Sequence, residues 1–262
     1  MKSGIKFIDQ EFVTLPLGLD ECQMIRIPDG VLNSPKPLVA FDFDGTLFEG
    51  WRTYHQAAVE IVMMYSDDLK CVPCAEKFKM GVHPDLYKWG VPSYVPLDDA
   101  WDIFTSLIVK IEKRNPCNLF PGVAEQLRKI ADKFHVIVVT LNSIHPVADI
   151  VRREAGLDVD VIVVEDKSAI LAELARRHYL HHSESRIPFY YFGDTSGDMK
   201  ATSSTRSLIY PVAVTTHEIK NIIGLRDLWV EEMRNSGARA FVYHNRIIDV
   251  INGGHLKNPM LF

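Results

Sequence analysis

The chain has 262 residues, of which 47% are hydrophobic and 24% charged, and its formal net charge is −5. This balance is ordinary for a soluble globular protein, and the length suits one large domain or a core with a smaller inserted one. The mild acidic balance argues against a general binder of nucleic acid or of anionic membranes, but it leaves room for a local basic pocket.

Four cysteines are too few for a disulfide scaffold in a chain of this length. The first twelve residues contain no apolar run of the length that a secretory signal needs. No segment approaches the roughly 18 uninterrupted apolar residues of a transmembrane helix. We therefore expect a cytoplasmic protein with reduced cysteines.

The N-terminal half combines one buried strand with several helices. Residues 1–37 are predicted to be an N-terminal extension laid on the core, with no assigned role. Residues 38–41 form a continuous apolar run, which is typical of a strand buried on both faces. Residues 51–66 and 97–111 have the apolar spacing of helices, and prolines divide the segment between them. Residues 49–118 are therefore predicted to form a helical insert.

Strands and helices alternate after residue 122. The predicted strands are 135–139, 159–164, 189–192, 208–214 and 240–243, and the predicted helices are 123–133, 145–155, 167–180, 217–235 and 245–252. Alternation of this kind indicates right-handed βαβ units. We predict an α/β fold, doubly wound, with a mostly parallel Rossmann-like sheet. The core comprises residues 38–48 and 119–262, and the helical insert is a second domain.

Two carboxylates leave the first predicted strand at its carboxyl end. The strand runs into DFDGTL, residues 42–47, so Asp42 and Asp44 are two positions apart and Gly45 permits a tight turn. In an open α/β sheet, ligands bind at the carboxyl ends of the strands. The alternative is an Asp-rich turn without a function. The strand before the carboxylates favours a site.

Two further strands are followed by residues that suit a phosphate group. Thr140 and Asn142 follow one strand, and their hydroxyl and amide groups can donate hydrogen bonds to a phosphoryl oxygen. Lys167 lies between the next strand and its helix, where it offers a positive charge to a phosphate or a carboxylate. Each signal is weak alone, because Thr is common in helix caps and most lysines are solvated.

The strand at 189–192 is followed by GDTSGD, residues 193–198. Asp194 and Asp198 therefore add two carboxylates to the same edge of the sheet. If they meet Asp42 and Asp44, the four groups cannot all ionise comfortably without a cation. Oxygen ligands without His or Cys select a hard ion, and Mg²⁺ is the usual one near phosphate. The alternative is a helix N-terminus with capping residues.

The four segments occur in order, each at the end of an apolar strand. Together they resemble the motifs of the haloacid dehalogenase-like (HAD) superfamily of phosphohydrolases, over roughly residues 38 to 250. Residues 42–46 resemble the first motif, and the others are matched by Thr140, Lys167 and the pair Asp194 and Asp198.

The insert also fits this resemblance. Residues 119–123, LFPGV, resemble the family's return from cap to core, and the helical insert resembles its type 1 cap domain. The chain is similar to capped phosphatases of the phosphoglycolate phosphatase kind, although Glu49 and Gly50 match that subgroup loosely. Because dehalogenases and phosphonate-cleaving relatives lack the second Asp, Asp44 favours cleavage of a phosphate ester.

The resemblance implies a mechanism with two carboxylates. Asp42 attacks phosphorus to form an aspartyl-phosphate, and Asp44 protonates the leaving oxygen and then activates water. The implied cofactor is Mg²⁺, held by Asp42, the backbone carbonyl of Asp44, and Asp194, with Asp198 binding directly or through water.

The resemblance also implies the contacts to the phosphate. Thr140 and Lys167 hold its oxygens, together with backbone N–H groups of the turn at Gly45, and Asn142 is a further contact. A helical cap over the site favours a small phosphorylated metabolite, with no nucleic-acid or membrane partner. Phosphoglycolate, a sugar phosphate, a nucleotide and pyrophosphate all stay open, as does the oligomeric state.

Two other functions are compatible with these residues. One is a phosphotransferase or mutase that uses the same aspartyl-phosphate and excludes water during transfer. The other is a non-catalytic binding protein that has kept the fold. The binding-protein function is disfavoured by the joint presence of Asp42, Asp44, Lys167 and Asp194, since a site that no longer catalyses has no need of all four.

Two other patterns receive no function. Cys71 and Cys74 have the spacing of a metal or redox pair, but no second pair accompanies them. His178, His181 and His182 lie at the end of a predicted helix, where we expect a solvated last turn rather than a metal site.

Overall fold

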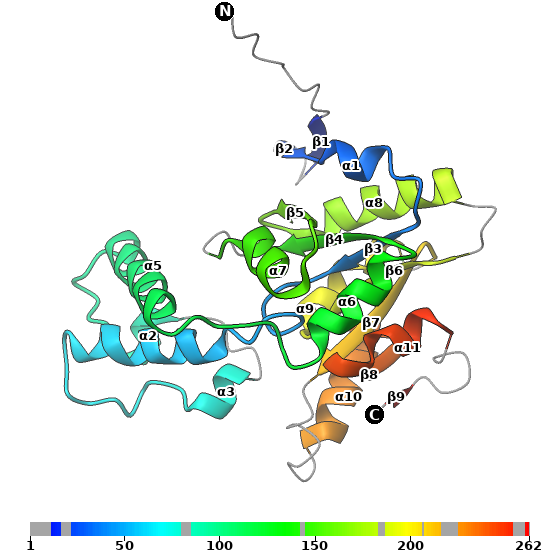
Figure 1. Cartoon of the computed structure of the whole chain (residues 1–262). Coiled ribbons are helices and arrows are strands. Elements are labelled where there is room, and N and C mark those ends of the chain that lie inside the picture. Colours follow the sequence, from blue (N-terminus) through cyan, green and yellow to red (C-terminus); the bar gives the residue numbers. More distant parts are fainter. Residues whose placement is uncertain are drawn as a thin grey trace, which may run out of the picture.

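The computed structural model describes residues 12–16, 22–79, 85–141, 145–182, 187–205, 207–215, 225–253 and 260–261. A seven-stranded parallel sheet crosses the centre of this structure (Figure 1). Its order is β5 (Asp160–Val163), β4 (His135–Thr140), β3 (Leu38–Phe41), β6 (Phe189–Gly193), β7 (Ile209–Thr215), β8 (Ala240–Tyr243) and β9 (Met260–Leu261).

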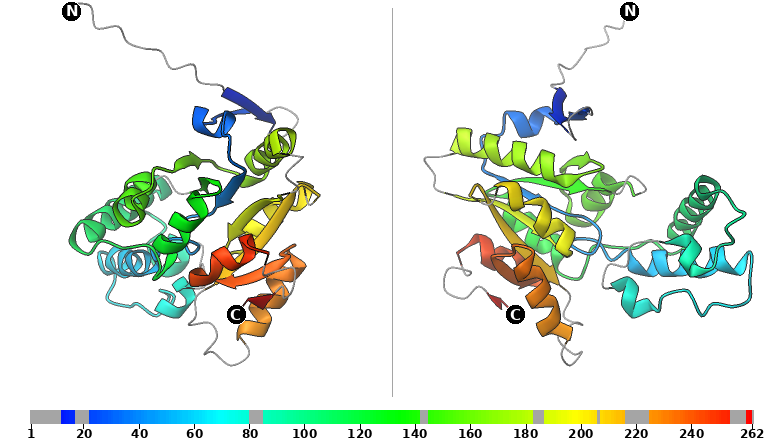
Figure 2. Two further views of the ribbon diagram at one scale, coloured as in Figure 1. Left: turned by 45° about the vertical axis from the view of Figure 1, so that its right-hand side comes forward. Right: turned by 180° about the vertical axis from the view of Figure 1, so that it is seen from behind.

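Helices cover both faces of the sheet, as Figure 2 shows from two sides. On one face lie α6 (Val123–Ala131), α7 (Val147–Ala155) and α11 (Ile247–Ile251). On the other lie α8 (Lys167–His182), α9 (Ser196–Ala201) and α10 (Leu225–Asn235). The described residues of this part also form the short 3-10 helices η2 (Ser203–Thr205) and η4 (His244–Arg246). The predicted doubly wound α/β fold is confirmed.

The sequence of β3 explains why the sheet is covered twice. Side chains alternate along a strand, so Val39 and Phe41 enter one hydrophobic cluster and Leu38 and Ala40 enter the other. All four residues are fully or almost fully buried. A strand that is apolar at every position requires two packed faces.

The predicted insert contains α2 (Trp51–Met63), α3 (Ala75–Lys79), α4 (Leu86–Trp89) and α5 (Leu97–Arg114). These helices form a hydrophobic cluster of their own, beside the sheet rather than on it (Figure 1). The two connections to the core run antiparallel to each other, with a bridge between Phe48 and Leu119 and a hydrogen bond from the Phe120 N–H to the Leu47 carbonyl.

The extension before β3 contains an antiparallel hairpin of β1 (Phe12–Pro16) and β2 (Cys22–Arg26), followed by the one-turn helix α1 (Asp29–Leu32). Of the predicted helix 217–235, residues 217–224 lie outside the described residues. Strand β9, which was not predicted, pairs with β8 and so extends the sheet by one strand. No helix in the described part of the chain is long and apolar enough to span a membrane.

The strand order fixes where a ligand would bind. From β3 the chain proceeds toward β4 and β5 on one side, and from β6 it proceeds toward β7 and β8 on the other. The order therefore reverses between β3 and β6, which are neighbours. In doubly wound sheets the crevice at such a reversal, outside the carboxyl ends of the strands, is the usual ligand site.

His178 departs from the prediction of a solvated helix end. Its imidazole is 4% exposed, accepts a hydrogen bond at Nδ1 from the Leu38 N–H at 3.1 Å, and donates from Nε2 to the Ile187 carbonyl at 2.8 Å. Helix α8 continues to His182, so residue 178 lies one turn inside the helix and against the start of β3. Burial lowers the pKa of His178 below its ordinary value of 6.5.

We predict that acid weakens the fold through this histidine. Because the pKa of His178 is higher in the unfolded chain than in the folded one, unfolded chains bind more protons, and the free energy of unfolding falls as pH drops below about 6.5. Chemical unfolding at several pH values will show a weaker dependence for His178→Gln. His178→Ala leaves the buried Leu38 N–H unpaired and costs about 2 kcal/mol. An unchanged pH dependence in His178→Gln would contradict this role.

Candidate active site

The four predicted motifs meet at the carboxyl edge of the sheet. Asp42 directly follows β3 and Asp194 directly follows β6, so they face the crevice where the strand order reverses. Thr140 is the last residue of β4 and is buried. Lys167 begins α8, in the connection that follows β5. Parallel strands deliver these side chains to one edge because their carboxyl ends coincide.

A lysine joins two of the carboxylates. The Lys167 Nζ donates to Asp42 Oδ1 at 2.5 Å and to Asp198 Oδ1 at 2.7 Å. The side chains of all three residues are less than 10% exposed. Asp194 lies in the same cluster, and one carboxylate oxygen from each of Asp42, Asp194 and Asp198 lies within 4.8 Å of the others. The site thus concentrates three acidic groups around one ammonium.

The local charges shift the acidities in this cluster. Burial raises the pKa of Asp42 to about 7, and the Lys167 ammonium opposes that rise. Burial, together with the charges of Asp42 and Asp198, raises the pKa of Asp194 well above its ordinary value. Burial alone would lower the pKa of Lys167, but the charge of Asp42 and other neighbours hold this pKa well above its usual range. The lysine therefore keeps its positive charge.

Asp198 is the best supported of the three carboxylates. Burial raises its pKa, but the charge of Lys167 and hydrogen bonds to the carboxylate lower it more, so the pKa of Asp198 lies below its ordinary value. The Tyr191 hydroxyl donates to Oδ1 at 2.7 Å, and the Thr195 hydroxyl donates to Oδ2 at 2.6 Å. Thr195 also caps α9, with Asp198 completing a capping box. The two interpretations of this segment, a helix N-cap and part of the site, are therefore compatible.

The cluster fits a hard divalent cation. Three carboxylates with a single counter-charge repel one another, and the raised pKa values of Asp42 and Asp194 are the consequence of this crowding and of burial. All the donors are oxygens, which is the preference of Mg²⁺ rather than of zinc. Among the described residues, Asp42, Asp194 and Asp198 are thus a suitable set of ligands.

Gly45 allows the first motif to turn against Asp194. Its φ is +76°, and a Cβ at this position would lie 2.1 Å from Asp194 Oδ2. Its N–H donates to the Phe48 carbonyl, and its carbonyl accepts a hydrogen bond from His244 Nε2 at 2.9 Å. The next residue, Thr46, donates to Asp194 Oδ1 at 3.1 Å. The turn therefore holds the carboxylate of the fourth motif directly.

Asp44 lies on the side of the site that faces the helical insert. Its carboxylate is 30% exposed, and its Oδ1 lies 3.7 Å from Nε2 of the buried His145. This partial exposure contrasts with Asp42 and leaves Asp44 accessible to a ligand above the sheet. Asn142, predicted as a phosphate contact, lies outside the described residues.

Four residues around the site were not assigned a role from the sequence. Thr46 belongs to the recognised first motif, but its contact with Asp194 depends on the fold. Tyr191 is a buried strand residue, like its neighbours in β6, and nothing in the sequence marks its hydroxyl. His145 follows β4 by five residues and His244 directly follows β8. A position after a strand is a signal of a site residue, but the sequence analysis did not use it for these two histidines.

Comparison with known proteins identifies the fold. No family model matches the chain, and no curated protein matches it significantly in sequence. Among solved structures, a HAD-like family hydrolase from Streptococcus pneumoniae is similar, with a TM-score of 0.55 and 16% identity over 83% of this chain and 98% of that one. The chain has the HAD-like fold.

Two further solved structures are similar to this chain. A protein described as a beta-phosphoglucomutase from Thermotoga maritima has a TM-score of 0.55 and 18% identity, over 83% of this chain and 99% of that one. A hydrolase from Pseudomonas syringae has a TM-score of 0.50 and 16% identity, over 84% and 97%. The resemblance of the motifs to the HAD superfamily thus agrees with the fold.

We predict that Gly45→Ala damages the site through Asp194. The substitution adds strain at a positive φ and a clash with the carboxylate, which together cost on the order of 3 kcal/mol in the free energy of unfolding. Gly156→Ala is the matched control, because Gly156 also has a positive φ of +67° but nothing within 4 Å of the added Cβ. Denaturant unfolding followed by tryptophan fluorescence measures both. Equal losses in the two variants would show that the approach of Asp194 is unimportant.

Proposed function

We propose that this protein is a Mg²⁺-dependent phosphatase that hydrolyses a small phosphorylated metabolite through an aspartyl-phosphate on Asp42. The observation that supports this most is the cluster of Asp42, Asp194, Asp198 and Lys167 in the crevice between β3 and β6. Asp44, two residues beyond Asp42 in the same turn, is the second carboxylate of the proposal.

The proposed reaction has two steps. In the first, a carboxylate oxygen of Asp42 forms a bond to phosphorus, the bond to the leaving oxygen breaks, and Asp44 gives that oxygen its proton. In the second, Asp44 takes a proton from water, the water oxygen attacks phosphorus, and the bond to Asp42 breaks. Inorganic phosphate leaves and both carboxylates return to their starting states.

The proposed cation ligands are the carboxylates of Asp42, Asp194 and Asp198 and the backbone carbonyl of Asp44. When bound, the cation supplies positive charge that offsets the repulsion between an anionic nucleophile and an anionic phosphate. Lys167 adds a fixed positive charge beside Asp42 and orients its carboxylate. The Thr195 and Tyr191 hydroxyls fix Asp198 in the same way.

The phosphate contacts are proposed on the same edge of the sheet. Lys167 and Thr140 would bind phosphoryl oxygens, with Gly45 in the turn and Asn142 as further contacts. The helical insert would enclose a small substrate and exclude water. Residues 49–118 are proposed as this cap, and the cytoplasmic location stays a prediction.

Phosphoryl transfer is a second candidate function. It uses the same aspartyl-phosphate, but a second substrate hydroxyl replaces water in the second step. One similar structure carries the name of a beta-phosphoglucomutase, which is an enzyme of phosphoryl transfer, and this supports transfer as a second candidate. Product analysis separates the two, since only hydrolysis releases inorganic phosphate.

We predict that phosphate release from a panel of phosphorylated metabolites requires both Mg²⁺ and Asp42. Asp42→Asn removes the nucleophile and lowers the rate at least about 10³-fold. Asp44→Asn removes the acid and base and lowers it about 10²- to 10⁴-fold. Asp158→Asn, an isosteric change at an exposed ion pair with Arg152, is the control and keeps full activity.

Three outcomes decide between the functions. Magnesium-dependent release that Asp42→Asn abolishes supports hydrolysis. A phosphorylated product without free phosphate moves the proposal to transfer. No product of either kind from folded protein with Mg²⁺ contradicts both and favours the binding-protein function.

A further inference from the structure

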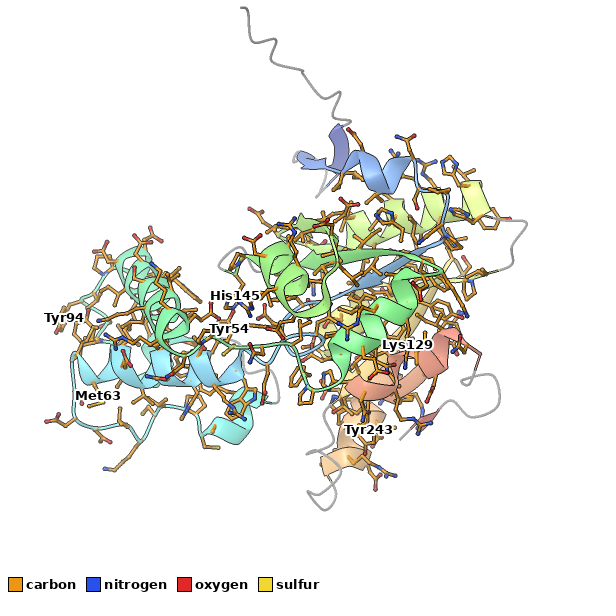
Figure 3. The ribbon with its side chains drawn as sticks, viewed as in Figure 1. Tyr54, Met63, Tyr94, Lys129, His145 and Tyr243 are labelled. Carbon is orange, nitrogen blue, oxygen red and sulfur yellow. The ribbon has the colours of Figure 1, made fainter. Side chains whose placement is uncertain are left out.

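His145 lies where the helical insert meets the core. It follows β4, two residues before α7, and its side chain is fully buried. The imidazole Nε2 lies 3.1 Å from the hydroxyl of Tyr54 on α2, and Nδ1 lies 3.0 Å from the carboxylate of Glu112 on α5. Figure 3 shows Tyr54 and His145 side by side at this junction. One core residue thus contacts both long helices of the insert.

Packing and hydrogen bonding fix the orientation of this ring. Because a carboxylate only accepts hydrogen bonds, Nδ1 carries the hydrogen that points to Glu112. Nε2 therefore faces Tyr54 and the active site. The ring centroid lies 4.9 Å from that of Phe48, and the Tyr54 ring meets it at 90° and 5.8 Å. Hydrogen bonds at both ring nitrogens and the aromatic rings packed around it restrict the orientation of this imidazole.

The same ring borders the turn that carries Asp44. Nε2 lies 3.7 Å from Asp44 Oδ1, so the two groups are neighbours at a distance beyond a hydrogen bond. Phe43 and Phe48, which flank the turn, stack on each other at 4.8 Å and both face His145. His145 therefore lies beside Asp44 and packs against the two rings that flank the turn from which Asp44 projects.

We propose that His145 is a positioning residue that holds Asp44 in its reactive orientation, and that Tyr54 and Glu112 make this orientation depend on the helical insert. The inference rests on the proposed function, because Asp44 is the acid and base there. When the insert moves away from the core, His145 loses both partners and Asp44 loses its lateral support. Proton transfer is thereby restricted to the state in which the insert encloses the substrate.

Two substitutions of similar size distinguish the contacts of Nε2 from those of Nδ1. Glutamine places a polar group near the position of Nε2, so His145→Gln keeps a contact with Tyr54 and Asp44 and loses the one with Glu112. Asparagine places its amide near Nδ1, so His145→Asn keeps Glu112 and loses Tyr54 and Asp44. Both variants fill most of the same space, so a purely structural role of the ring affects them alike.

The readout is the dependence of activity on the leaving group. A general acid matters most when the leaving oxygen is a poor leaving group, as in an alkyl phosphate, and least in an aryl phosphate such as p-nitrophenyl phosphate. The ratio kcat/KM reports the steps up to aspartyl-phosphate formation, so it isolates the role of Asp44 as an acid. The test is to compare kcat/KM on both esters for each variant.

The proposal predicts that His145→Asn loses about 10- to 100-fold in kcat/KM on the alkyl ester, since a misplaced catalytic group costs about that much, and less than about threefold on the aryl ester. His145→Gln and Glu112→Ala, which each remove only the contact between Nδ1 and Glu112, lose less on the alkyl ester than His145→Asn does and stay within about threefold on the aryl ester. Tyr54→Phe shows the same selective loss on the alkyl ester as His145→Asn, because it removes the insert's hold on the edge of the ring that faces Asp44. Thr53→Ala is the control, since the Thr53 hydroxyl lies at the same junction and contacts Cys117 Sγ at 2.9 Å.

Equal losses on the two esters, or equal losses in His145→Asn and His145→Gln, would overturn the proposal. Hydrogen exchange at residues 43–48 provides a readout that does not need activity, because the N–H groups of Gly45, Leu47 and Phe48 all donate within this turn. Faster exchange in His145→Asn than in His145→Gln supports the positioning role even if the wild type releases no phosphate, which would contradict only the proposed function. Unchanged exchange in both overturns the inference by itself.

Discussion

The structure depends on one electrostatic constraint, which is that three carboxylates share a buried site with a single lysine. Asp42, Asp194 and Asp198 bring oxygens within 4.8 Å of one another, and Lys167 bonds to two of them. Such a cluster is stable only if its members are neutralised, protonated or bound to a cation. Lys167 neutralises the cluster in part, and burial still raises the pKa of Asp42 to about 7.

The fold brings the residues of this cluster together and restricts their movement. Parallel strands end at one edge of the sheet, and the reversal of strand order between β3 and β6 brings together the first and fourth motifs, where Thr46 and Asp194 are 148 residues apart in sequence. Helices on both faces bury β3 completely, so the residues at its end have little freedom. The turn at Gly45 then reaches Asp194, and the helical insert approaches from the side of Asp44.

Sequence reasoning located the cluster because each member follows an apolar strand, and such strands have a common direction. Lys167 and Asp194 are recognisable for that reason, as is the helical insert from its apolar spacing. His178 was wrongly predicted to lie in a solvated helix end, and His145 received no role. Leu38, Tyr54 and Glu112, which contact these two histidines, lie on other elements more than 30 residues away, and only the packed fold brings them into contact. Strand β9 is too short to show a pattern, and its pairing depends on the exposed edge of β8.

Calorimetric titration with Mg²⁺ tests the central claim most directly. The wild-type protein is expected to bind one ion per chain at neutral pH, and Asp194→Asn, which removes one ligand and keeps the shape, is expected to bind about tenfold more weakly or worse. Asp158→Asn serves as the control and is expected to bind as the wild type does. Equal affinity in the wild type and Asp194→Asn, or no binding to folded wild type, would show that the buried carboxylates are not a cation site.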